Sequence, residues 1–88
     1  MNIYKYRLNH SIETEIVLPI GSVVLNVEVQ EGEPHIWIMV ADNPSKESRF
    51  FHGIMTGGQF DWKRNWNYIG TVHALSGRFV VHYFEVIK

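Results

Sequence analysis

The chain has 88 residues, a formal net charge of −1 and no cysteine. This length suffices for one domain around one core, so we expect residues 1–88 to form a single domain. The absence of cysteine excludes a disulfide framework, a thiolate metal site and a cysteine nucleophile, and the near-neutral charge argues against a dedicated nucleic-acid-binding protein, which usually has a strong basic excess.

Short stretches with alternating apolar and polar residues follow one another along the chain, which is typical of half-buried β-strands. The predicted strands are 2–8, 12–18, 22–30, 35–41, 49–55, 68–75 and 78–87. No helix is expected beyond a single turn within 44–50 or 61–67. About seven short antiparallel strands separated by turn signals predict an all-β fold, either a small sandwich or a partly open barrel.

Strand 35–41 differs from the others because both of its faces are apolar, with Ile36, Ile38 and Val40 on one and Trp37 and Met39 on the other. Such a pattern favours a central strand or an interface between copies. Exposed sheet edges also favour association between copies, so we expect self-association, most simply as a twofold homodimer.

The last two predicted strands meet at Ser76-Gly77, a good signal for a tight hairpin turn. The turn predicts a register with three pairs: Leu75 with Arg78, His73 with Val80, and Thr71 with His82. In that register one set of side chains shares the core face: Val72, Ala74, Phe79, Val81 and Tyr83.

Residues 56–67 interrupt the strand pattern with three large aromatic residues, two adjacent cations and a Gly-Gly pair. Loops on a rigid scaffold often carry recognition residues, and Trp and Arg often dominate interface energies. The segment therefore predicts a partner-binding surface formed by Phe60, Trp62, Lys63, Arg64 and Trp66. The alternative is that the Trp side chains fold back and cap the sandwich, which makes 59–67 a structural element.

His73 and His82 are predicted to lie diagonally on one face of the last hairpin, near Thr71 and Arg78. Because imidazole titrates near neutral pH, His73, Arg78 and His82 form an alternative ligand-binding or acid–base site. No Asp or Glu stands at a fixed local spacing to orient either imidazole. The five histidines are scattered without an HxH or HxxxH pair, so we expect no metal and no cofactor.

A resemblance covers nearly the whole length. It rests on Ile3-Tyr4-Lys5-Tyr6, on Leu18-Pro19-Ile20-Gly21, on the stretch from Gly32 to Trp37, on Tyr68-Ile69-Gly70-Thr71-Val72 and on the stretch from Phe79 to Glu85. In these features the chain resembles a family of small phage-encoded all-β proteins of unknown function. The resemblance implies an accessory protein made during infection. Residues 59–67 do not match the family pattern.

These observations lead to one main hypothesis and two alternatives. The main hypothesis is a non-enzymatic binding module for host takeover in the host cytoplasm, where it acts as an inhibitor of a host or anti-phage defence protein. One alternative is a sponge for a nucleotide signal, with Trp62 or Trp66 stacking on the base and Lys63, Arg64 or Arg78 holding phosphate. The other is a small His-dependent, phosphoesterase-like enzyme. No apolar run approaches the roughly 18 residues of a membrane span, so no membrane partner is expected.

Overall fold

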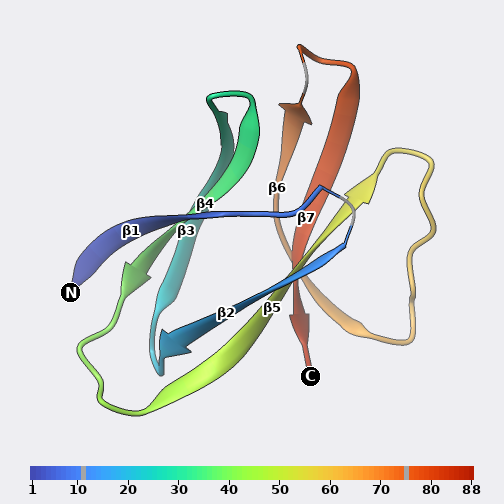
Figure 1. The fold of residues 1–88 in the computed structure, drawn as a ribbon. Helices are drawn as coiled ribbons and strands as arrows, with labels where there is room; N and C mark the ends of the chain where they lie inside the picture. The colour runs from blue at the N-terminus through green and yellow to red at the C-terminus, as the bar shows by residue number, and fades with distance from the viewer. Residues whose placement is uncertain (11, 75) are drawn as a thin grey trace.

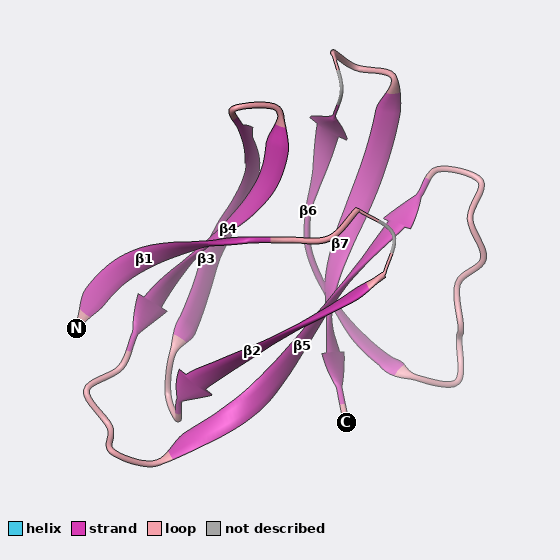
Figure 2. Ribbon diagram, in the orientation of Figure 1, coloured by secondary structure: helices cyan, strands magenta, loops and turns pink. Residues whose placement is uncertain are grey.

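The computed structural model describes residues 1–10, 12–74 and 76–88. It contains the strands β1 (Asn2–Arg7), β2 (Glu13–Pro19), β3 (Val23–Gln30), β4 (Glu33–Val40), β5 (Lys46–Met55), β6 (Asn65–Ala74) and β7 (Phe79–Ile87) (Figure 1). The described residues form strands, turns and loops only (Figure 2). They therefore include no helix that could cross a membrane.

The strands form two antiparallel sheets, one in the order β1-β4-β3 and the other in the order β2-β5-β7-β6. Strand β3 of the first sheet lies against β6 of the second, but the two sheets are not hydrogen-bonded into a closed barrel. The predicted all-β fold with seven short antiparallel strands is confirmed. The strand with two apolar faces, β4, is the central strand of its sheet.

The core lies between the inner faces of the two sheets, where alternate residues of each strand point inward. Phe51, Leu18, Ile36 and Ile38 have no exposed surface. Each such side chain stabilises the fold by roughly 1.5–3 kcal/mol relative to an exposed one. The buried residues of the core cluster are Leu8, Ile16, Leu18, Val27, Ile36, Ile38, Phe51, Val72, Val81 and Tyr83.

Three strands begin earlier than the sequence predicted. Strand β4 begins at Glu33 instead of residue 35, β5 at Lys46 instead of 49, and β6 at Asn65 instead of 68. Pro34 falls just before the predicted strand 35–41. It lies instead near the start of β4, buried, and its carbonyl accepts a hydrogen bond from the Leu8 N–H at 3.0 Å.

The predicted register of the last hairpin is confirmed for His73 with Val80 and for Thr71 with His82, whereas the predicted Leu75 pair lies outside the described residues. Ser76 and Gly77 both have positive φ, at 58° and 83°, as a tight hairpin turn requires. A bulge between Tyr68 and Gly70 turns Ile69 toward the core. The prediction that Phe79 is a core residue is wrong, because it lies at the strand end and keeps 40% of its surface exposed.

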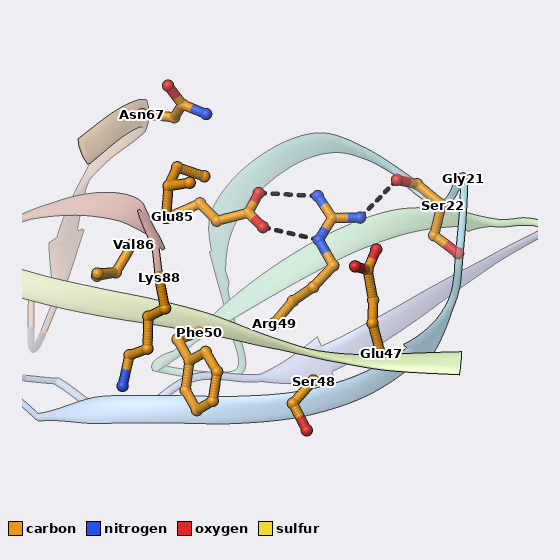
Figure 3. Close-up of a pocket in the computed structure, with 11 residues that line it drawn as sticks. Gly21, Ser22, Glu47, Ser48, Arg49, Phe50, Asn67, Glu85, Val86 and Lys88 are labelled. Atoms are coloured by element: carbon orange, nitrogen blue, oxygen red, sulfur yellow. Dashed lines mark hydrogen bonds and ion pairs between the residues drawn. The ribbon is translucent and has the colours of Figure 1, made fainter. Parts of the chain in front are cut away.

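A largely buried ion pair within the four-stranded sheet also contacts the segment that precedes β3 of the other sheet. The guanidinium of Arg49 on β5 donates to both carboxylate oxygens of Glu85 on β7, at 2.7 and 2.8 Å, and donates a third hydrogen bond to the carbonyl of Ser22 beside β3 (Figure 3). The two side chains are only 16% and 13% exposed. The hydroxyl of Ser22 accepts from the Ala41 N–H and donates to the Pro19 carbonyl.

We expect Arg49→Met to lower the free energy of unfolding by about 3 kcal/mol, because it leaves the Glu85 carboxylate buried without a partner. The double variant Arg49→Met/Glu85→Leu removes both charges and should recover most of that loss. Urea denaturation of the wild type, both single variants and the double variant measures the coupling. Additive losses in the double variant would show that the two side chains do not act as a pair.

Candidate functional site

The aromatic and cationic residues singled out in the sequence do not all lie in a loop. The connection between β5 and β6 covers Thr56 to Arg64, whereas Trp66 and Asn67 belong to β6. The loop leaves β5 through a turn in which Gly57 has a φ of 88°, a backbone conformation that favours glycine. The prediction of one continuous loop over 59–67 is therefore wrong for its last three residues, 65–67, which belong to β6.

The four-stranded sheet carries aromatic side chains on the face turned away from the core. Strand pairing sets Glu13, His52, Phe84 and Tyr68 in one row across the sheet. Trp66 lies beside this row, with ring centroids 5.7 Å from both His52 and Phe84. These aromatic residues give the sheet a second apolar surface that faces outward.

The loop folds over this outer surface. The Phe60 ring lies with its centroid 4.8 Å from that of Trp66 and 5.2 Å from that of Phe84, and Tyr68 packs on the other side of Phe84 at 5.4 Å. We call His52, Phe60, Trp66, Tyr68 and Phe84 the outer aromatic cluster. It fixes the middle of the loop against the sheet.

Trp66 anchors the loop. Its indole N–H donates to the Asp61 carbonyl at 2.6 Å, and the Arg64 guanidinium lies over its ring at 5.2 Å. Because its ring also packs in the outer aromatic cluster, Trp66 has a structural role here. The alternative in which a Trp side chain folds back onto the sandwich therefore applies to Trp66. Its ring covers the outer face of a sheet, however, and not an end of the sandwich.

Trp62, in contrast to the packed Trp66, lies at the tip of a tight turn with 79% of its surface exposed. Asp61 forms the turn: its side chain accepts from the Lys63 N–H at 3.1 Å and its carbonyl from the Arg64 N–H at 3.2 Å. The Lys63 ammonium lies 5.8 Å from the centroid of the Trp62 ring. The turn therefore presents an indole ring and a cation to solvent on an ordered backbone.

An ion pair closes the loop onto the opposite edge of the sheet. Arg64 donates to Glu13 on β2 at 2.9 Å, and Lys88 lies 3.4 Å from the same carboxylate. Burial alone would raise the pKa of Glu13, but hydrogen bonds and charges from Arg64 and Lys88 outweigh it and hold that pKa below its ordinary value. Burial lowers the pKa of the neighbouring His52 imidazole.

Between the loop and the sheet lies a pocket of about 480 Å³. Its lining residues are His52, Ile54, Gln59, Phe60, Asp61, Trp62, Arg64 and Trp66. Its lining combines aromatic rings with imidazole, amide, carboxyl and guanidinium groups, which would suit a small group that has both apolar and polar parts. All the predicted partner-binding residues except Lys63 contribute to this pocket.

The predicted histidine site is only partly assembled. The two nitrogens of His82 lie 2.8 Å from the Thr56 hydroxyl and 2.9 Å from the Thr71 hydroxyl, and Thr71 in turn contacts the Tyr68 hydroxyl at 2.6 Å. The hydrogen bonds of the described residues do not link His73 or Arg78 to this chain of hydroxyl groups. Within the same residues, no group of three or more His, Asp or Glu side chains has a metal-binding arrangement.

Sequence reasoning missed five residues that shape the site: Glu13, His52, Asp61, Tyr68 and Phe84. Asp61 had a local signal, since Asp commonly accepts from the backbone N–H two residues later in a turn. Glu13 had none, because its partner Arg64 lies 51 positions away in the sequence.

The two tryptophans should differ sharply in their contribution to stability. We expect Trp66→Ala to lower the free energy of unfolding by about 2–3 kcal/mol, since it removes a packed aromatic ring and its hydrogen bond. Trp62→Ala should change it by less than about 0.5 kcal/mol, as is usual for an exposed side chain. Urea denaturation followed by circular dichroism measures both, and equal losses would contradict the assignment of separate roles.

Comparison with known proteins places the chain in a family. A search of curated proteins and a search of solved structures each found no match. A family model, however, matches the chain over its whole length. The chain therefore belongs to the family described as a domain of unknown function (DUF7352), whose model covers residues 1–88.

Proposed function

We propose that this protein is a non-catalytic protein-binding module and that the turn around Trp62 is its anchor. The observation that carries this proposal is the contrast between the two tryptophans of the segment, since Trp66 is fixed in the outer aromatic cluster and Trp62 is 79% exposed. A large exposed indole on an ordered turn is the kind of side chain that fills a partner's pocket and dominates binding energy.

The loop is organised before any partner arrives. Phe60 packs on the sheet, Asp61 accepts three hydrogen bonds, and Arg64 is paired with Glu13. Because these contacts form during folding, little conformational entropy is lost when Trp62 enters a binding site. Preorganisation of this kind favours a specific partner.

The chemistry of the surface indicates the chemistry of that partner. The indole ring of Trp62 would bind in an apolar pocket of the partner. The ammonium of Lys63 beside it would pair with a carboxylate of the partner at the rim of that pocket. Arg64 contributes less charge, because its guanidinium is already paired with Glu13. A groove with an apolar floor and an acidic edge would fit.

The biological setting that we propose is inhibition of a host or anti-phage defence protein in the host cytoplasm. It is supported by the resemblance of the sequence to small phage-encoded proteins. The proposed binding surface does not depend on this setting. It depends on the exposure of Trp62 and on the hydrogen bonds that hold its turn.

A nucleotide sponge is the second candidate, and the pocket beneath the loop is the observation that favours it. Phe60 and Trp66 offer ring faces and Arg64 lies at the rim. A phosphate would, however, have to displace the Glu13 carboxylate from Arg64, to which it is bound at 2.9 Å. We therefore rank this candidate below protein binding.

We expect Trp62→Ala to weaken binding to the natural partner by at least about 2 kcal/mol, or roughly thirtyfold, as truncation of a hot-spot residue does. The measurement is an affinity pull-down from lysate of infected host cells, followed by titration of the retained protein. Tyr4→Ala is the matched control, since Tyr4 is an exposed aromatic residue on the other sheet.

A protein that is retained by the wild type and by Tyr4→Ala but lost by Trp62→Ala would establish the anchor. Equal retention by all three would contradict it. If no protein is retained, a melting-temperature shift with a panel of linear and cyclic nucleotides would identify the sponge, because a ligand that binds only the folded state raises its stability.

A further inference from the structure

The three-stranded sheet has an apolar outer face of its own. Ile3, Val23 and Leu25 are 58%, 45% and 46% exposed. Trp37 and Met39 of the central strand β4 are half-buried and point to the same side, because they alternate with the core residues Ile36 and Ile38.

The two sheets differ in how their outer faces are covered. On the four-stranded sheet, Phe60 and the rest of the loop cover the aromatic side chains. On the three-stranded sheet, the outer face carries side-chain contacts but no covering segment of chain among the described residues. Lys5 is hydrogen-bonded to Gln30, and the Asn26 amide donates to one oxygen of Glu28 at 3.2 Å. The His35 and Trp37 rings lie 6.2 Å apart. The apolar row of Ile3, Met39 and Val23 is left in contact with solvent.

The strand register arranges charges around this apolar face in an asymmetric way. Arg7 on β1, His35 on β4 and Glu28 on β3 form one row across the sheet. One edge of the row therefore carries a cation and the other edge a carboxylate. Arg7 lies 3.6 Å from Glu33 with 70% of its side chain exposed, and a surface pair of this kind holds a side chain only weakly.

We propose that this face binds a second copy of the chain in a twofold dimer whose axis runs parallel to β4. Rotation about such an axis places β1 of one copy over β3 of the other at the same level along the strands. Arg7 then faces Glu28 of the second copy, and the symmetry creates the same pair twice. The apolar row of each copy packs against that of the other.

The charges favour a twofold axis parallel to β4 over a twofold axis that runs across the strands. A twofold axis running across the strands would place β1 over β1 and β3 over β3, so the edge that carries Arg7 would face the same edge of the other copy. Like charges in such a contact oppose association. Only the axis along β4 pairs each cationic edge with an acidic edge.

The size of the face sets the strength of the dimer. Three strands about 4.8 Å apart and about eight residues long present roughly 400 Å² per copy. The two copies together would bury roughly 800 Å², which is smaller than a stable specific interface and allows only a weak, transient complex. We therefore expect a dimer that forms and dissociates with protein concentration. It would display two Trp62 turns at once, since these lie on the other sheet.

Charge reversal tests the proposed symmetry. Arg7→Glu and Glu28→Arg should each shift the monomer–dimer equilibrium at least tenfold toward monomer, since each creates two pairs of like charges. The double variant Arg7→Glu/Glu28→Arg should dimerise like the wild type. An equimolar mixture of the two single variants should also dimerise, because each copy then meets the opposite charge.

Sedimentation equilibrium over a series of protein concentrations measures the monomer–dimer equilibrium of the wild type, the two single variants, the double variant and the equimolar mixture. Lys46→Glu is the matched control, because it makes the same change of charge at an exposed position on the other sheet. Recovery of the dimer in the mixture cannot arise within one chain, so it would establish the contact between copies. A wild type that stays monomeric at its solubility limit, or single variants that dimerise like the wild type, would overturn the proposal.

Discussion

A β-strand has two faces, and this short chain places large apolar side chains on both faces of its central strands. One set fills the core between the sheets, from Phe51 on β5 to Ile38 on β4. The other set points outward and includes Phe84 and Trp66 on one sheet and Trp37 on the other. Since exposed apolar surface is unfavourable in water, the second set must be covered. The way each outer face is covered determines the recognition properties that we propose.

On the four-stranded sheet the cover is the chain itself. Phe60 packs on the aromatic cluster, and Arg64 reaches across to Glu13 on the far edge strand. The turn at Asp61 leaves Trp62 largely exposed to solvent. The interactions that protect the aromatic face are thus the same interactions that fix the exposed indole. In the function that we propose, structure and recognition are divided between two tryptophans only four positions apart in the sequence.

Local patterns in the sequence predicted most of the fold. Alternation located all seven strands, and Ser76-Gly77 set the register that brings Thr71 beside His82. Local patterns could not reveal features that depend on distant residues. The bulge that turns Ile69 inward and the pairing of Arg64 with Glu13 both arise from tertiary packing. The composition of the loop drew attention to this segment, but it could not distinguish the anchored Trp66 from the exposed Trp62.

The central claim is that the loop is ordered in the free protein, with Trp66 fixed and Trp62 in solvent. Hydrogen exchange of the indole N–H groups, followed by NMR and assigned with single Trp variants, tests it most directly. The account predicts slowed exchange at Trp66, whose N–H is bonded to the Asp61 carbonyl, and exchange near the rate of free tryptophan at Trp62. Equally fast exchange at both indoles would contradict the account, because it would mean that the loop is not held against the sheet.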